Sequence, residues 1–95
     1  MEVRETADLL ERRWQLSILY AALTGALRFN EFAEAVAGIS PRMLSERLRD
    51  LEAAGLVQRT VLPSSPPTVE YRLTDRGRKL GPIIEAMREY SRMAP

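Results

Sequence analysis

Two arginines and a glutamate offer the clearest chemistry in this sequence. Arg42, Glu46 and Arg49 are spaced so that they share one side of a predicted helix, at roughly 100° of rotation per residue. A guanidinium group can donate two hydrogen bonds to O6 and N7 of guanine, and a carboxylate can accept one from the amino group of cytosine. These groups could therefore contact base edges in a DNA groove. Two other interpretations stay open: Glu46 could pair with Arg42 along the helix, and the whole face could be solvated surface.

The helix that carries these groups has clear start and stop signals at Ser40 and Gly55. Ser40 can accept a hydrogen bond from a free amide of the first turn, and Pro41 suits the first helical position because no N–H is needed there. Gly55 can adopt the left-handed conformation that ends many helices. An apolar stripe at i, i+4 and i+7 should hold the helix to a core: Leu44, Leu48 and Leu51.

A shorter helix and a tight turn are expected just before this one. Asn30 is predicted to cap a helix of residues 31–37, which Gly38 should end. Its inward face is apolar, with Phe32, Ala33 and Val36. Residues 26–29 should form a short extended link. Together the two helices predict a helix-turn-helix over about residues 30–54.

Two strands follow, separated by a proline-rich loop. Residues 56–62 and 68–73 alternate apolar and polar side chains and are rich in β-branched types, which is typical of half-buried strands. The loop Pro63–Pro67 cannot continue a strand ladder. The pattern predicts a β-hairpin wing over about residues 57–73.

The two ends of the chain are predicted to be helical. Residues 6–25 should form a helix that Thr6 caps and that breaks near residues 11–13, because its two apolar stripes are out of phase. Thr74 should cap the last helix, with a bend near Pro82. Trp14 is interpreted as a core or dimer-contact residue, with ligand stacking as the alternative. The fold class is thus mainly α with a small β-hairpin, a winged helix-turn-helix.

Composition narrows the classes of function. The chain has 95 residues, which suits one domain spanning 1–95, and its net charge is +1, so any basic surface for nucleic acid must be local. It contains no histidine and no cysteine, so the common zinc sites, thiol nucleophiles and disulfides are excluded. We expect no metal and no cofactor. No apolar run is long enough to cross a membrane and the start lacks a secretory pattern, so a cytoplasmic location with no membrane partner is expected.

Several segments, in the same order along the chain, resemble the HxlR-type winged-helix transcriptional regulators of bacteria and archaea. They are Arg13-Trp14, Arg28–Phe32, Gly38–Leu48, Leu51–Val57 and Val69–Thr74. The resemblance implies a homodimer that binds an inverted-repeat DNA operator, with the helix Ser40–Ala54 in the major groove and the loop Pro63–Pro67 at the flanking backbone or minor groove. It also implies that dimer contacts form between helices at about residues 5–13 and 75–92.

These arguments give two sets of candidate residues. The predicted DNA-binding set is Ser40, Arg42, Met43, Ser45, Glu46, Arg47, Arg49, Arg28, Arg59, Ser64, Ser65 and Thr68. The predicted dimer-interface set is Leu9, Leu10, Trp14, Leu80, Ile83, Ile84, Met87 and Tyr90. Five further basic residues are interpreted as solvated surface: Arg12, Arg13, Arg76, Arg78 and Lys79.

Two departures from the family pattern limit what can be transferred. Many members carry a cysteine close to where Met1 stands, and the absence of cysteine here excludes thiol-based sensing. The wing carries hydroxyls where a basic residue would suit phosphate contact. An alternative function is therefore a winged-helix module for protein–protein contact without DNA. An enzyme is not expected, because the acidic residues are spread over helix surfaces and do not converge. A small-molecule effector is compatible with the sequence but is not specified by it.

Overall fold

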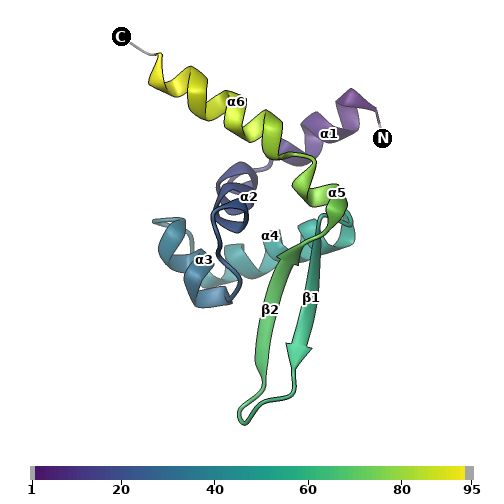
Figure 1. The fold of residues 1–95 in the computed structure, drawn as a ribbon, viewed down its shortest axis with the longest axis vertical. Coiled ribbons are helices and arrows are strands. Elements are labelled where there is room, and N and C mark those ends of the chain that lie inside the picture. Colours follow the sequence, from purple (N-terminus) through teal and green to yellow (C-terminus); the bar gives the residue numbers. More distant parts are fainter. Residues whose placement is uncertain (1, 94–95) are drawn as a thin grey trace.

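The computed structural model describes residues 2–93. Its elements are α1 (Val3–Leu10), α2 (Gln15–Leu23), α3 (Phe29–Ala35), α4 (Pro41–Ala53), β1 (Val57–Leu62), β2 (Thr68–Leu73), α5 (Asp75–Arg78) and α6 (Gly81–Arg92). Helices α1 and α6 lie at one end of the molecule, and the tip of the β1–β2 hairpin lies at the other (Figure 1). The predicted fold class, mainly helical with one antiparallel hairpin, is confirmed.

Three positions lie outside the described residues: Met1, Ala94 and Pro95. The two ends of the predicted domain 1–95 and the expected family cysteine position near Met1 fall there. No helix within residues 2–93 has the length and apolar character needed to cross a bilayer.

The core lies between α2, α3 and α4. The leucine stripe of α4 is fully buried as predicted, with Leu44 and Leu51 at 0% exposure and Leu48 at 1%. Phe32 of α3 is also completely buried and meets the ring of Tyr71 on β2 edge to face, with 6.3 Å between ring centroids. The leucine side of α4 therefore faces the core, and its polar side faces solvent.

The predicted ends of α4 are confirmed. Ser40 accepts a hydrogen bond from the Met43 amide at 3.1 Å, and Pro41 is the first helical residue. Gly55 has a φ of 76°, the left-handed conformation that its position after the helix requires.

The start of α3 differs from the prediction. The helix begins at Phe29, so Asn30 lies inside it and does not cap it. Instead, the Glu31 carboxylate reaches back and accepts hydrogen bonds from the amides of Arg28 at 2.8 Å and Leu27 at 2.9 Å. One carboxylate oxygen of Glu31 thus satisfies two amides at the start of α3, so no cap from Asn30 is needed.

The first helical segment is divided, as predicted, but its start is different. Helix α1 begins at Val3, and the Thr6 hydroxyl donates to the Glu2 carbonyl at 3.3 Å within the helix, so Thr6 is not its cap. The break covers residues 11–14. Trp14, the last residue of this connector, has a φ of 76°, the only positive value at a non-glycine residue in the part of the chain that the structure describes.

The hairpin follows the prediction closely. Strands β1 and β2 pair from Val57 with Leu73 to Leu62 with Thr68, while Leu56 sits in the core just before the strand. The link before α3 is not a strand, although the Leu27 carbonyl accepts from the Tyr71 amide at 2.7 Å.

The predicted last helix is two helices. Thr74 caps α5 by accepting from the Gly77 amide at 3.1 Å, as expected. The chain then breaks at residues 79–80, slightly before the predicted bend. Pro82 lies in the first turn of α6, where its missing N–H costs nothing.

Candidate nucleic-acid interface

Arg42 and Arg49 lie on the solvent side of α4, opposite its leucine stripe. Both side chains are exposed. Neither forms a hydrogen bond or ion pair with any other residue between positions 2 and 93. Both guanidinium groups are therefore available for contact with a partner molecule.

The other candidate residues of α4 and its cap are less available for contact with a partner molecule than Arg42 and Arg49. Met43 and Ser45 are half-buried, and the Ser40 hydroxyl is engaged in capping the helix. The Glu46 side chain is 56% exposed and lies 3.8 Å from the Arg47 guanidinium. It makes no contact with Arg42 within the described residues, so the alternative pairing considered from the sequence does not form.

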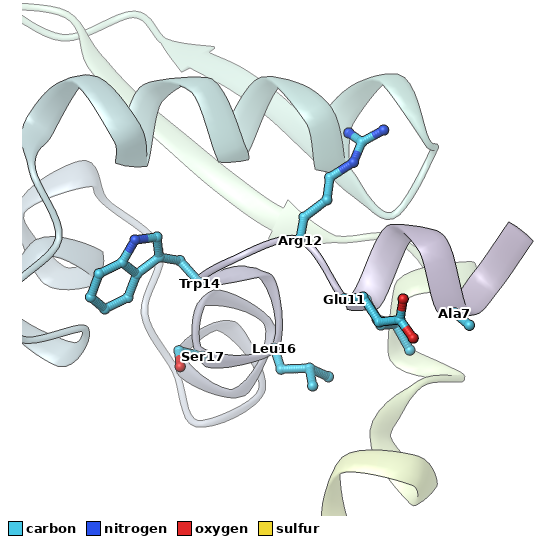
Figure 2. A pocket seen from close by; sticks show the side chains of 7 residues that line it. Ala7, Glu11, Arg12, Trp14, Leu16 and Ser17 are labelled. Atoms are coloured by element: carbon cyan, nitrogen blue, oxygen red, sulfur yellow. The ribbon is translucent and has the colours of Figure 1, made fainter.

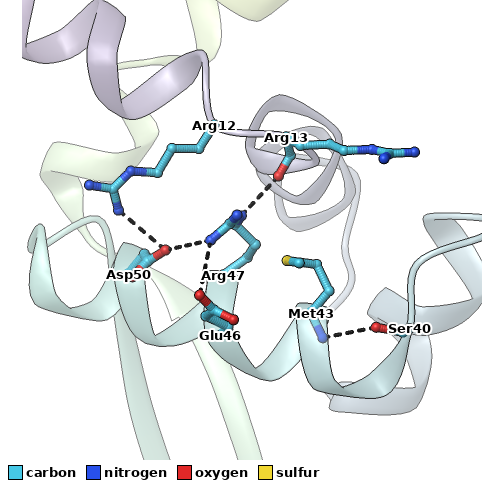
Figure 3. Close-up of polar contacts among 7 residues, drawn as sticks. All are labelled: Arg12, Arg13, Ser40, Met43, Glu46, Arg47 and Asp50. Atoms are coloured by element: carbon cyan, nitrogen blue, oxygen red, sulfur yellow. Dashed lines mark hydrogen bonds and ion pairs between the residues drawn. The ribbon is translucent and has the colours of Figure 1, made fainter.

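Arg47 differs from the other two arginines of α4, because its side chain is only 15% exposed and is held inside the protomer. Its Nε donates to the Arg13 carbonyl at 2.9 Å, and its terminal nitrogen donates to the Asp50 carboxylate, also at 2.9 Å. Arg12 approaches the same carboxylate oxygen at 3.2 Å (Figure 3). The guanidinium group of Arg47 thus turns toward the α1–α2 connector.

This network differs from the prediction at Arg12. The sequence predicts a solvated charge there, whereas Arg12 pairs with Asp50. The spacing of Arg47 and Asp50, three residues apart on a helix, was a usable signal for their pairing. Nothing local to the sequence indicated that a residue more than thirty positions upstream would join them.

The wing carries fewer available polar groups than its sequence suggests. The Ser64 hydroxyl donates to the Pro66 carbonyl at 2.7 Å and lies 3.0 Å from the Thr68 hydroxyl. Ser65 and Arg59 are exposed and make no hydrogen bond with other described residues. Of the candidate wing residues, Arg59 and Ser65 are therefore the two whose polar groups are not engaged within the described chain.

Arg28 lies at the start of α3 with its side chain exposed. Its backbone amide and that of Leu27 donate to Glu31, and these two hydrogen bonds lower the pKa of the Glu31 carboxyl below its usual range. The carboxylate is thus kept charged beside the Arg28 guanidinium. It lies at the N-terminal end of α3, where the helix dipole also favours negative charge.

The predicted dimer-interface residues fall into two groups. Ile84 is 6% exposed and belongs to the protomer core, and four others pack against that core while partly buried: Leu9, Leu10, Trp14 and Leu80. Three residues of α6 remain exposed, Ile83 at 46%, Met87 at 48% and Tyr90 at 76%. These three recur at i, i+4 and i+7 and form one apolar stripe on the outside of α6.

An open pocket of about 350 Å³ lies between α1 and α2. Figure 2 shows Glu11 and Leu16 on one side of the connector and Arg12 extending toward α4. Trp14 also lines the pocket, and the Arg13 guanidinium lies over its ring at 4.7 Å from the centroid. The described residues contain no cluster of three or more acidic side chains that could hold a metal ion.

Comparison with known proteins identifies this arrangement. The model of the HxlR-like helix-turn-helix family matches residues 9–94. The chain belongs to this family. It is therefore a helix-turn-helix transcriptional regulator of HxlR type and not an enzyme, as the sequence predicted.

Curated relatives and solved structures agree with this assignment. The chain is 44% identical over 80 residues to YvaP of Bacillus subtilis, an uncharacterized HTH-type transcriptional regulator, and the match covers 84% of this chain and 74% of the relative. It is 39% identical over 84 residues to the HTH-type transcriptional regulator YodB of Bacillus subtilis, covering 88% and 75%.

The redox regulator HypR in its oxidized form has a similar structure, with a TM-score of 0.90 and 41% identity, covering 98% of this chain and 96% of that chain. Reduced YodB from B. subtilis superimposes with a TM-score of 0.82 and 38% identity, covering 96% and 91%. The 95 residues here contain no cysteine, so none of them can form a thiol–disulfide switch.

Proposed function

We propose that this HxlR-type regulator binds operator DNA as a homodimer, with α4 of each protomer in the major groove. The observation that carries the proposal is the two-sided character of α4. Its leucine side is fully buried, while Arg42 and Arg49 are exposed and unpaired with other residues of the described chain. A helix held in this way presents uncompensated guanidinium groups, which can donate bidentate hydrogen bonds to base edges.

The spacing of the two arginines suits a short run of bases. Residues seven apart on an α-helix are separated by about 10 Å along its axis. Since base pairs are stacked at ~3.4 Å, this distance corresponds to about three base pairs. Arg42 and Arg49 could then contact separate bases, or one base and one phosphate, within a single half-site.

The outer stripe of α6 supports the homodimer. Ile83, Met87 and Tyr90 expose three large apolar side chains on one helix face, and such a contiguous patch marks an interaction surface. Helix α1 lies at the same end of the molecule (Figure 1). A twofold contact there would place two copies of α4 about one DNA turn apart, ~34 Å, and give an inverted-repeat operator.

The wing is proposed to contact the flanking backbone with modest strength. Arg59 supplies a free charge on β1, and Arg28, whose guanidinium lies beside the Glu31 carboxylate, supplies an exposed charge at the start of α3. Ser65 is the one wing serine whose hydroxyl is not engaged within the described residues. Such contacts position a protein on DNA without reading sequence.

The test uses DNA selected by the wild-type protein from a randomised duplex library, followed by anisotropy titrations at several salt concentrations. Binding should weaken steeply with salt because phosphate contacts release counterions. Arg42→Ala and Arg49→Ala should each weaken binding, by about 5- to 150-fold if each loses a bidentate base contact of ~1–3 kcal/mol.

Lys79→Ala is the matched control, because it removes one exposed charge outside α4 and should leave affinity nearly unchanged. Absence of salt-dependent binding to any duplex would contradict the proposal and favour a protein–protein module. Unchanged affinity in both arginine variants would remove α4 as the contact surface.

A further inference from the structure

We propose that Arg47 and Asp50 are positioning residues, which fix the orientation of α4 relative to α1 through the connector of residues 11–14. They do so without touching DNA. This inference rests on the proposed function, since it concerns how the DNA-contacting helix is held. It assigns Arg47 a role different from that of Arg42 and Arg49, its neighbours on the same helix.

The contacts run from α4 to the connector at two separate points. Arg47 Nε donates to the Arg13 carbonyl at 2.9 Å, a bond to the backbone itself. One turn along α4, the Asp50 carboxylate accepts from Arg47 at 2.9 Å and pairs with Arg12 at 3.2 Å. Figure 3 shows the Arg47 guanidinium between Asp50 and the Arg13 carbonyl, while the Arg13 side chain points away. The guanidinium fork thus ties one carboxylate and one backbone carbonyl together.

The connector needs such support because α1 packs against the core only through partly buried residues, Leu9 and Leu10 among them. None of the eight residues of α1 is fully buried, so the helix gains limited packing energy of its own. The connector ends at Trp14, whose left-handed backbone with a φ of 76° is unfavourable for a non-glycine residue. Such a conformation persists only where its surroundings determine it, and the contacts from α4 act on the two residues just before Trp14.

Trp14 makes a third contact between the connector and the helix-turn-helix. A Cβ atom placed on Gly38, in the turn between α3 and α4, would lie 3.7 Å from Cη2 of Trp14. The indole therefore reaches the start of the turn, while Arg47 and Asp50 hold the middle of α4. The connector thus contacts the turn before α4 at Gly38 and α4 itself at Arg47 and Asp50, so a displacement of α1 would be transmitted to α4 through these points.

Burial favours this role for Arg47 over phosphate contact. Its side chain is 15% exposed and that of Asp50 is 26% exposed, so both charges are partly shielded from water. Releasing Arg47 to a phosphate would leave the Asp50 carboxylate with only Arg12 as its partner, and that side chain is itself 50% exposed. Loss of one member of a shielded pair is costly because the other remains uncompensated.

The first experiment measures the distance between α1 and α4 directly and needs no DNA. The chain contains no cysteine, so Asp8→Cys and Glu52→Cys, both at exposed positions, accept spin labels specifically. Labelled protein diluted with unlabelled protein reports the distance within one protomer. We expect one narrow distribution, which Arg47→Ala and Asp50→Asn broaden or shift. Arg49→Ala is the matched control on the same helix and should leave it unchanged.

The second experiment separates positioning from DNA contact. Arg47→Ala should widen the range of half-site spacings that the protein accepts, while the slope of log affinity against log salt stays as in wild type. Loss of a phosphate contact would instead lower that slope by about one, as expected if an arginine such as Arg49 contacts a phosphate. Asp50→Asn should also weaken operator binding, although removing a negative charge near DNA would by itself strengthen it.

Arg47→Lys keeps the charge but loses the fork, and should resemble Arg47→Ala in both experiments while its circular dichroism spectrum stays native. An unchanged distance distribution together with a lowered salt slope in Arg47→Ala would overturn the proposal. If the wild-type protein binds no duplex, the proposed function fails, and the distance measurement alone still decides whether Arg47 and Asp50 hold α1 against α4.

Discussion

Gly77 provides the most direct test of how the wing is joined to the last helices. It is buried in α5, and a Cβ atom at this position would overlap the Leu56 carbonyl oxygen and lie 3.0 Å from Cδ2 of Leu73. That carbonyl cannot easily move, because it accepts a hydrogen bond from the Thr74 amide at 3.0 Å. Gly77→Ala must therefore displace α5 from the base of the hairpin.

The expected change in the free energy of unfolding for Gly77→Ala is the sum of two opposing contributions. Alanine in place of glycine favours a helix by about 1 kcal/mol. Overpacking of a close contact costs up to ~3 kcal/mol. We expect a net loss of about 2 kcal/mol in the free energy of unfolding. For a domain of this size that corresponds to a decrease in Tm of roughly 8–16 °C.

Urea and thermal unfolding followed by circular dichroism measure this change, at one fixed protein concentration because dimerisation would shift the midpoint. Gly81→Ala is the matched control, since the nearest atom to its Cβ would be Cδ2 of Leu23 at an ordinary 3.7 Å. That variant should be as stable as the wild type or slightly more stable. A Gly77→Ala protein as stable as Gly81→Ala would refute the steric argument.

Three further predictions concern the helices that hold the interface. Glu31→Gln should lower the free energy of unfolding at neutral pH, because the folded protein lowers the pKa of the Glu31 carboxyl. This stabilisation is present above the ordinary carboxyl pKa and is lost as pH falls through the lowered value, so the difference from wild type should vanish in acid. Ser40→Ala should cost about 1 kcal/mol by removing the cap that accepts from Met43, measured by urea unfolding. Gln15→Met should raise the free energy of unfolding by ~1–3 kcal/mol, because the fully buried amide of Gln15 has no hydrogen-bond partner among the described residues.

Each of these has an outcome that contradicts it. For Glu31, the same difference from wild type at neutral and acid pH would show that charge is not responsible, and Asn30→Ala should leave stability unchanged as a control. A Ser40→Ala protein with wild-type stability would mean that solvent replaces the cap at no cost. Destabilisation by Gln15→Met would indicate that the amide is satisfied in solution, for example by a buried water.

Much of the fold follows from short-range signals in the chain. The recognition helix was predictable because Ser40, Pro41 and Gly55 mark its ends and three leucines mark its buried side, all within sixteen residues. The hairpin was predictable for the same reason, since alternation and a proline-rich loop are local properties. Arg42 and Arg49 could be placed on the outer face of α4 once the leucines fixed its orientation.

The other features of the fold depend on contacts between segments that are distant in the sequence. The sequence could not show that Glu31 would cap α3 in place of Asn30, because both residue types suit a helix start. Nor could it distinguish Ile84, which α2 and its neighbours bury, from the adjacent Ile83, which stays exposed. The side of α6 that packs against the core depends on the orientation that the break at residues 79–80 gives to the helix.

The chemistry of the candidate site likewise depends partly on the local sequence and partly on tertiary contacts. By itself the sequence determined that one helix would carry several arginines and that no thiol or imidazole would accompany them. Only the tertiary structure separated those arginines, because a side chain's role depends on what lies within reach of its charge. Arg42 and Arg49 face solvent, whereas the packing of the α1–α2 connector brings Arg12 and the Arg13 carbonyl to Arg47 and Asp50.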